Sequence, residues 1–330
     1  MQQSTLKKLS EVLGISISTV SRALKDHPDI SDNTKKRVKD LAEALEYEPN
    51  TYAVQLRTRQ SNLLGLMLPN IDNFFYDSFI AAVEQEARLH GYSVMIMQSR
   101  DRVQIETSNL QLFRKNMVMG VFVSVSIETE DMAPFRKLEE MKIPVVFIDR
   151  VAEVSGFHKV RMADEDASKI AAEIIIKKQK KRVLGLFGHP HLSLTRVRCA
   201  SFKERFEKLS PATELIIEYP EDINESKRVT LKALQEEPRP DVIFCMGDLI
   251  LIGVMSAVHE LSLKVPEDIS IISISNGLIP TMYNPKITFV ETSGYKLGKL
   301  AFSQMLSCLK DPGEPEEVIV ESVLVEGGSI

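Results

Sequence analysis

From Leu63 onward, short apolar segments alternate with stretches of helical pattern, and this alternation constrains the fold most. The segments are LLGLMLP, SVMIMQS, VFVSV, PVVFIDR, KVRM, RVLGLFG, ELIIEY, VIFCM and ISIISIS. Helices are predicted between them near residues 79–89, 105–115, 135–141, 167–178, 196–209, 226–234 and 249–261. Apolar strands that alternate with helices are typical of parallel sheets covered on both faces. About nine such units exceed one sheet, so we expect two successive α/β lobes.

The 330 residues also exceed one comfortable core, which suggests two or three domains. Ligands of open α/β sheets bind at the carboxyl ends of the strands. In a chain with two such lobes, that position is the cleft between them.

The chain starts differently, with two short helices in TLKKLSEVLGIS and SISTVSRAL. Thr5 is the predicted cap of the first helix, whose apolar row is Leu6, Leu9, Val12 and Leu13. Gly14 supplies the left-handed residue that ends this helix.

The second helix, residues 17–24, begins after the predicted cap Ser16. At 100° per residue its side chains divide into two arcs. One arc holds Ile17, Ser18, Ser21 and Arg22, and the other holds Thr19, Val20, Ala23 and Leu24. Small polar residues with one arginine can enter a major groove, so the pair predicts a DNA-binding helix-turn-helix. An ordinary helical hairpin is the alternative.

A third helix is predicted in SDNTKKRVKDLAEALEY, with Ser31 as its cap and a stripe of Val38, Leu41, Ala42 and Leu45. Pro49 ends that register. The segment that follows, up to Gln60, is too short to form a stable helix alone.

Charge and composition limit the compartment and the partners. Residues 1–60 have a net charge of +2 and the remaining 270 have −7, so a mildly basic head precedes an acidic body. This charge distribution permits DNA binding without proving it. No run of eighteen apolar residues and no hydrophobic signal core occur, so we expect a cytoplasmic protein without a membrane partner. The three cysteines, Cys199, Cys245 and Cys308, suggest neither a disulfide framework nor a zinc site.

Catalytic motifs are not found. GLFGHP lacks the G-x-G-x-x-G spacing, and neither a P-loop nor G-x-S-x-G occurs. His189 and His191 stand without a cysteine or carboxylate at ligand spacing, so a loop histidine pair is favoured over a metal site. We therefore expect no enzyme activity, no cofactor and no metal.

The motifs together resemble those of the LacI/GalR family of bacterial transcription regulators. They run from residues 5–50 through PNTYAVQLRT, NLLGLMLPNIDNFFY, PVVFIDR, RVRCASF, VPEDISII and NPKITFVE to the terminal VLVEGGSI. The resemblance implies an α + α/β fold, in which a hinge helix joins a helix-turn-helix head to a two-lobed, periplasmic-binding-protein-like core of parallel sheets. It implies a head at 1–48, a hinge at 49–60 and a core at 61–330. The first lobe would comprise about 61–160 plus 290–320, and the second about 161–289 plus 321–330. The strand ITFVE and the helix at 296–306 are expected to return to the first lobe.

The resemblance also implies DNA-binding roles. Ile17 and Ser18 would discriminate bases, with Ile17 favouring an apolar edge such as a thymine methyl, and Arg22 would reach guanine. Ser16, Thr19, Ser21 and Asn33 would contact phosphates. The other positions of the predicted DNA-binding set are Thr5, Asn50, Ala53, Leu56 and Arg57. Ala53 would let two hinge helices approach closely, and paired Leu56 side chains would wedge into the minor groove at the operator centre. A linker residue tucked onto the core is the alternative for Leu56.

Effector positions follow from the same resemblance. Asn73, Phe74, Asp149, Arg198, Gly247, Asp248, Ser275 and Asn276 match family positions at the ligand. Arg198 can fork onto hydroxyls, a carboxylate or a phosphate, and a surface ion pair is its alternative. Three departures stand out, because the family's usual residues at positions 247 and 275 are asparagine and aspartate, and Phe74 replaces the proline of NPF. The missing carboxylate at Ser275 argues against a simple neutral sugar. A phosphorylated sugar, a sugar acid, a nucleoside or no ligand stays open.

The sequence thus predicts a DNA-binding transcription regulator, a repressor, that acts as a homodimer or tetramer on a pseudo-palindromic operator in double-stranded DNA. A small molecule between the lobes would control it, as inducer or as corepressor. A soluble sugar-type binding protein without DNA function is the main alternative, and a nucleotide-dependent α/β enzyme is a weaker one.

Overall fold

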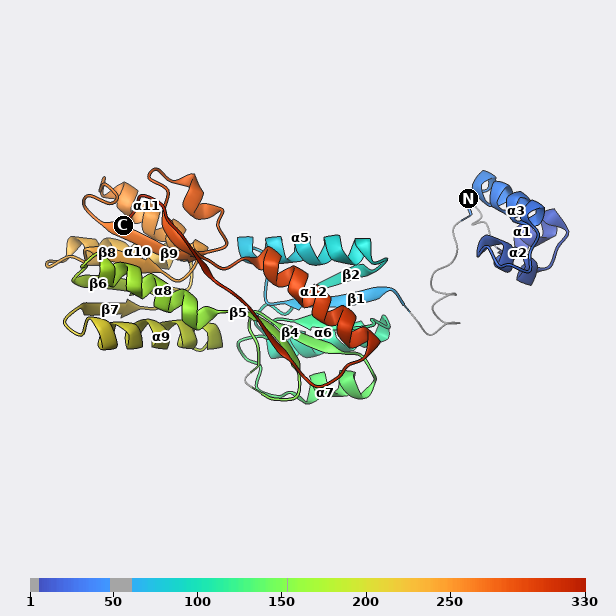
Figure 1. Cartoon of the computed structure of the whole chain (residues 1–330), viewed down its shortest axis with the longest axis horizontal. Coiled ribbons are helices and arrows are strands. Elements are labelled where there is room, and N and C mark those ends of the chain that lie inside the picture. Colours follow the sequence, from blue (N-terminus) through green and yellow to red (C-terminus); the bar gives the residue numbers. More distant parts are fainter. Residues whose placement is uncertain (1–5, 48–60, 153) are drawn as a thin grey trace. The chain divides into compact units, whose positions relative to one another are not determined.

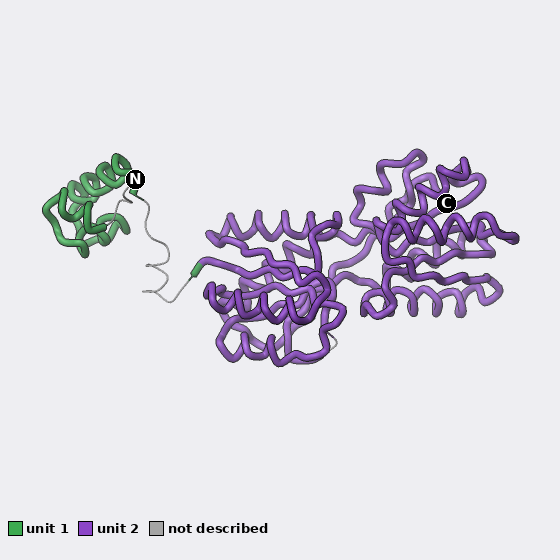
Figure 2. Tube along the Cα trace, turned by 180° about the vertical axis from the view of Figure 1, so that it is seen from behind, with its two compact units in different colours: residues 1–61 green, residues 62–330 purple. Residues whose placement is uncertain are grey.

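The structure is a computed structural model that describes residues 6–47, 61–152 and 154–330. The chain divides into two compact units, Met1–Ser61 and Asn62–Ile330, coloured separately in Figure 2. No helix in the described part of the chain is long and apolar enough to cross a membrane.

The head consists of α1 (Leu6–Leu13), α2 (Ile17–Leu24) and α3 (Asp32–Ala44) around a small core. The side chains of this core are Leu9, Val20, Ala23, Val38 and Ala42. Two of the predicted caps are confirmed: Ser16 Oγ accepts from the Thr19 amide at 3.1 Å, and Ser31 Oγ accepts from Thr34 at 3.3 Å. Gly14 has φ +65°, as its position after α1 predicts.

One member of the predicted apolar row of α1 does not lie in the core. Val12 is 60% exposed, whereas Leu9 is fully buried. On the helical wheel Val12 lies 100° from Leu13, so it falls beside the face that meets α2 and α3 rather than on it.

The core unit contains two six-stranded sheets, one in each lobe (Figure 1). The first sheet has the order β11-β5-β4-β3-β1-β2, with every pair parallel. Its strands are β1 (Leu63–Leu68), β2 (Ser93–Gln98), β3 (Val121–Val123), β4 (Val145–Ile148), β5 (His158–Met162) and β11 (Glu317–Val320). The predicted α + α/β class with two parallel-dominated lobes is confirmed.

The second sheet has the order β12-β10-β9-β8-β6-β7 and is parallel except for the β10–β12 pair. Its strands are β6 (Arg182–Leu186), β7 (Glu214–Glu218), β8 (Val242–Cys245), β9 (Ser270–Ser275), β10 (Thr288–Glu291) and β12 (Val323–Val325). The short strands β11 and β12 were not predicted, because runs of four and three residues carry little periodic signal.

Helices cover both faces of each sheet. Those of the first lobe are α5 (Phe74–Leu89), α6 (Val103–Lys115), α7 (Ala133–Glu140) and α12 (Gly294–Lys310), and those of the second are α8 (Asp164–Lys177), α9 (Ser193–Leu209), α10 (Ile223–Gln235) and α11 (Asp248–Glu260). A 3₁₀ turn, η1 (Ile279–Met282), follows β9. The closest helix pairs are α5 with α12, α8 with α9, and α10 with α11.

The chain passes between the lobes three times, after β5, after β10 and after β11. The helix expected to return to the first lobe does so as α12, which packs against α5. The strand ITFVE does not: it forms β10 in the second sheet, so that prediction is wrong. Ile287 and Val290 are buried in the second lobe's core, where they continue the apolar layer started by β9.

Candidate functional site

The exposed arc of α2 is the candidate surface for reading DNA. Ile17 is 47% exposed although it is apolar, and the side chain of Arg22 is 58% exposed. Arg22 Nη1 lies 4.0 Å from Asp29 Oδ2, a distance at which an exposed pair holds the side chain only weakly. The opposite arc is the buried one, with Val20 and Ala23 fully inside. The predicted division is confirmed for these residues and for the exposed Ser18, whereas Ser21, Thr19 and Leu24 are all half-buried.

Neighbouring hydroxyls occupy the start of the same helix. Ser16 Oγ lies 2.7 Å from Ser18 Oγ and 2.8 Å from Thr19 Oγ1. Ser21 is half-buried, and Asn33 is exposed in the first turn of α3. The other members of the predicted set, Thr5, Asn50, Ala53, Leu56 and Arg57, lie outside the described residues.

A cleft of about 480 Å³ lies between the two lobes of the core unit. Residues from the carboxyl ends of β1, β4, β6, β8 and β9 line it, as expected for parallel sheets. All eight positions of the predicted effector set line this cleft: Asn73, Phe74, Asp149, Arg198, Gly247, Asp248, Ser275 and Asn276.

Asp149 is a half-buried acid of the first-lobe wall. It follows β4 with φ +55°, a conformation that short polar residues tolerate, and its Oδ2 accepts from the Tyr76 hydroxyl at 2.7 Å. Ser124 Oγ lies 2.9 Å from the same hydroxyl. Burial raises the pKa of Asp149, and the bond from Tyr76 opposes that rise. The Tyr76 hydroxyl therefore stabilises the ionised form of a carboxyl whose ionisation burial disfavours.

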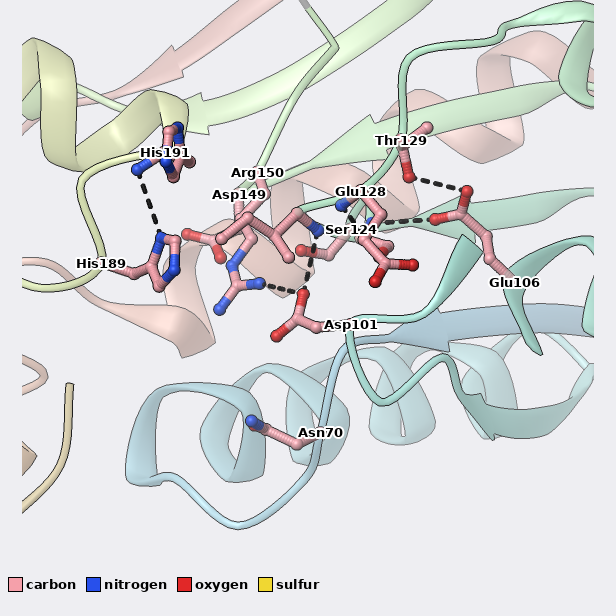
Figure 3. A network of polar contacts seen from close by, with 12 residues as sticks. Asn70, Asp101, Glu106, Ser124, Glu128, Thr129, Asp149, Arg150, His189 and His191 are labelled. Atoms are coloured by element: carbon pink, nitrogen blue, oxygen red, sulfur yellow. Dashed lines mark hydrogen bonds and ion pairs between the residues drawn. The ribbon is translucent and has the colours of Figure 1, made fainter. Parts of the chain in front are cut away.

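Next to Asp149, Arg150 forms an ion pair with Asp101 (Figure 3). Arg150 Nη1 lies 2.7 Å from Asp101 Oδ1, which also accepts from the Ile127 amide at 3.1 Å. This pair orders the loop that leads into α7. Both residues line the cleft, yet the sequence analysis did not single them out. Arg150 directly follows Asp149 in the sequence, and this position could have identified it as a cleft residue.

Asn73 and Phe74 stand at the start of α5. Asn73 is its cap, since Oδ1 accepts from the Tyr76 amide at 2.8 Å, and its Nδ2 donates to Asn70 Oδ1 at 3.3 Å. The cap therefore fixes the chain direction at the cleft. The carbonyl of Phe74 accepts from Asn276 across the cleft at 3.0 Å.

Arg198 on α9 lies in the second-lobe wall of the cleft. It is 7% exposed, and its Nη1 donates to the Met246 carbonyl at 3.0 Å. Its Nε and Nη2 both reach Asp164, at 2.7 and 2.6 Å. The alternative considered for Arg198, a surface ion pair, is wrong, because this pair is buried. Two of the five N–H groups of a guanidinium stay available after three such contacts.

Asp248 and Ser275 form a second acidic corner. The Ser275 hydroxyl donates to Asp248 Oδ1, and the Asn276 amide donates to Oδ2 at 3.2 Å. Burial raises the pKa of Asp248, while these two bonds oppose the rise. Asp248 therefore supplies a carboxylate to this wall of the cleft, and Ser275 donates a hydrogen bond to it.

Gly247 begins α11 without a side-chain cap. Its φ of −171° is extended backbone that any residue adopts, and a Cβ there would meet nothing within 4 Å. A larger residue therefore has room at this wall of the cleft.

The two histidines form a loop turn rather than a cluster. His189 Nδ1 accepts from the His191 amide at 3.2 Å, and its Nε2 lies 3.5 Å from Glu221 Oε1. His189 lines the cleft, whereas His191 lines a neighbouring hollow of about 240 Å³. Within the described residues, no three His, Cys, Asp or Glu side chains gather at a distance that would hold a metal ion.

Two family models match this chain. Residues 5–50 match bacterial regulatory proteins of the lacI family, and residues 175–330 match a periplasmic binding protein-like domain. The chain is 28% identical over 310 residues to the ribose operon repressor of Bacillus subtilis, covering 93% of this chain and 92% of that protein. It is 24% identical over 317 residues to the HTH-type transcriptional repressor PurR of Vibrio atlanticus, covering 96% and 95%.

Solved structures share the same fold. The lac repressor dimer bound to operator and the anti-inducer ONPF matches with a TM-score of 0.88 at 21% identity, over 99% of both chains. A LacI-family regulator from Enterococcus faecium with bound ribose matches with a TM-score of 0.73 at 18% identity, over 81% of this chain and 98% of that one. At these identities the likeness establishes the fold alone.

A helix-turn-helix head and a two-lobed, periplasmic binding protein-like core define the protein as a DNA-binding transcription regulator. The head thus matches the lacI family of bacterial regulatory proteins, and residues 175–330 of the core match a periplasmic binding protein-like domain.

Proposed function

We propose that the protein is a repressor that binds a pseudo-palindromic operator as a homodimer and is controlled by a small molecule in the interlobe cleft. The observation that carries the proposal is that all eight predicted effector positions, scattered from Asn73 to Asn276, line one cleft. The exposed arc of α2 supplies the DNA-reading surface. The protein carries out no catalysis in this proposal, and it requires neither cofactor nor metal.

The charges of the cleft favour an effector without a negative charge. Four carboxylates line it, Asp101, Asp149, Glu221 and Asp248, against the two guanidinium groups of Arg150 and Arg198. Both guanidinium groups already hold an aspartate. A sugar or nucleoside offers hydroxyl donors to these carboxylates, whereas a phosphorylated sugar or a sugar acid would meet repulsion. The names of the relatives, which include ribose operon repressors, agree with a sugar-type effector.

An apolar sheet edge supports a second copy of the chain as partner. Strand β2 is the edge of the first sheet, and Ile96 on it is 40% exposed. Leu89 at the end of α5 is 71% exposed, and Met117 after α6 is 36% exposed. Open apolar edges of this kind are covered in stable proteins, and a second copy would bury them. A symmetric dimer carries two heads, which match the two half-sites of a palindromic operator. A tetramer would need a second interface between dimers.

Effector control requires a difference in affinity between two arrangements of the lobes. Such coupling typically amounts to about 1–3 kcal/mol. In the proposal the effector stabilises one arrangement of the first lobes and thereby sets the spacing of the two hinges, residues 49–60. Leu56 of each hinge would enter the minor groove at the operator centre.

The deciding experiment is selection of bound fragments from a genomic DNA library by the purified full chain, followed by sequencing. An enriched palindrome with a flexible central step supports the regulator, and the adjacent genes narrow the effector. If neither low salt nor a panel of sugars and nucleosides produces enrichment, the alternative of a small-molecule binding protein without DNA function is favoured instead.

A further inference from the structure

Asn276 makes three side-chain hydrogen bonds from one lobe to the other. It follows β9 in the second lobe, and its Nδ2 donates to the Phe74 carbonyl at 3.0 Å. Its Oδ1 accepts from the Gly294 amide at 2.9 Å and from Ser78 Oγ at 3.1 Å. The single Ser78 hydroxyl proton is shared with the Phe74 and Phe75 carbonyls, at 3.1 and 3.0 Å. All three partners belong to α5 or to the first residue of α12, in the first lobe.

These bonds use most of the hydrogen-bonding capacity of the Asn276 side chain. A primary amide has two donor and two acceptor sites, so three of four are committed to the first lobe. Little capacity remains for a ligand, although Asn276 lines the cleft. The family resemblance implied that Asn276 contacts the effector. Its hydrogen bonds favour instead a role in joining the two lobes.

The two helices that Asn276 holds form one body. A Cβ on Gly294 would lie 2.2 Å from the Phe75 carbonyl oxygen, and one on Gly298 would lie 2.8 Å from that of Phe79. Glycines four residues apart thus let α12 approach the backbone of α5 closely. Because Phe74 starts α5 and Gly294 starts α12, Asn276 binds this helix pair at its cleft end.

The same residue is joined to the acidic corner of the cleft. Its backbone amide donates to Asp248 Oδ2 at 3.2 Å, and the preceding Ser275 donates to Oδ1. A molecule that contacts Asp248 or Ser275 would therefore act on the residue whose side chain holds the first lobe.

The geometry points to Asn276 as the positioning residue that sets the angle between the lobes, by fastening the second lobe to the α5–α12 pair. The inference rests on the proposed function only in that the interlobe angle is what an effector selects. The hydrogen bonds of Asn276 form a continuous connection between the two lobes. The effect of this connection on the interlobe angle is what the experiment measures.

The test measures the distance between the lobes in the full chain without DNA or effector. Spin labels are attached at Lys137→Cys on α7 and Glu207→Cys on α9, both exposed. The native Cys199, Cys245 and Cys308 are buried. Pulsed dipolar spectroscopy then gives the distance distribution. With Asn276 intact we expect one narrow distribution, and Asn276→Ala should broaden and shift it.

Two variants test the bond network itself. Ser78→Ala removes one bond from the first-lobe side and should cause a smaller change. Combined with Asn276→Ala it should add nothing further, because both remove the same interaction. Asn276→Asp keeps the acceptor bonds but loses the donor to Phe74, so an intermediate distribution is expected.

Asn109→Ala is the matched control. Asn109 is buried within the first lobe, where its Nδ2 donates to the Gln98 carbonyl at 2.9 Å. Its loss should leave the interlobe distribution unchanged. The inference is overturned if Asn276→Ala keeps the parent distribution, or if Asn109→Ala broadens it equally. Should Asn276→Ala fail to fold, unchanged distributions in both Ser78→Ala and Asn276→Asp overturn it as well. None of these results depends on operator binding, so the proposed function is tested separately.

Discussion

Arg198 holds Asp164 through two nitrogens, with Nε at 2.7 Å and Nη2 at 2.6 Å from the same carboxylate oxygen. The pair joins the middle of α9 to the first residue of α8, and both side chains are 9% exposed. A buried charge without its partner is costly, whereas an intact pair roughly breaks even against apolar residues. Arg198 therefore serves the second lobe's structure as well as the cleft.

The first prediction concerns this pair. Arg198→Ala leaves Asp164 buried without its counter-charge and should lower the free energy of unfolding by about 3–5 kcal/mol. Denaturant unfolding of the full chain measures it. The double variant Arg198→Met/Asp164→Leu removes both charges and should recover much of the loss. A double variant that is no more stable than Arg198→Ala alone would contradict the account.

The second prediction compares two glycines. Gly247→Asn has open space and extended backbone, and asparagine is a favoured cap, so stability should change by less than about 0.5 kcal/mol. Gly294→Ala places a Cβ 2.2 Å from a backbone oxygen and should cost about 1–3 kcal/mol. Thermal unfolding of both variants measures these changes in stability. Equal stabilities would show that the α5–α12 contact tolerates a methyl group.

The third prediction is a pH dependence at Glu139. Burial raises its pKa from 4.5 to about 6, with Arg136 opposing the rise. The folded protein thus holds this proton more tightly than the unfolded chain, and stability is lost as pH rises from about 4.5 through 6. Glu139→Gln should therefore be more stable than the parent at about pH 7.5, by roughly 1 kcal/mol after allowing for partial solvent screening. Below about pH 4.5 the two should be equal.

Denaturant titrations at both pH values measure this difference. Glu140→Gln removes an exposed carboxyl from the same helix and serves as the control. If Glu140→Gln gave the same pH-dependent gain, the cause would be the net charge of the helix and not the burial of Glu139.

The fourth prediction concerns base reading by α2. Arg22→Ala should weaken binding to the enriched operator by about 1–3 kcal/mol, since one bidentate contact to guanine is lost. Binding to unrelated DNA should fall much less. Fluorescence anisotropy at matched salt measures both, with Arg37→Ala on α3 as the charge control. Equal losses on both DNAs would mean that Arg22 contacts phosphate only.

The fifth prediction concerns self-association. Ile96→Lys puts a charge on the apolar edge strand β2 and should shift the protein from dimer to monomer in sedimentation equilibrium. Ile319→Lys is the control, because Ile319 is 47% exposed on β11 at the opposite edge of the same sheet. A dimer that survives Ile96→Lys would place the interface elsewhere.

The local structure of this protein follows from short stretches of its sequence. Serine caps, Gly14 and the two-arc pattern of α2 predicted the head, because caps and helical periodicity act over a few residues. Apolar runs alternating with helices predicted two parallel sheets for the same reason. Family spacing also led to eight positions that meet at one cleft.

Tertiary structure alone decided which distant groups pair. Nothing near Ile287 distinguishes a strand of the first sheet from one of the second, since both edges accept an apolar run. The Arg198–Asp164 pair spans 34 residues, and Asn276 reaches Phe74 across 202. Those contacts depend on sheet order and on the three crossings between lobes, which a local pattern does not encode. The sequence therefore named the cleft residues, and only the fold showed which of them form hydrogen bonds from one lobe to the other.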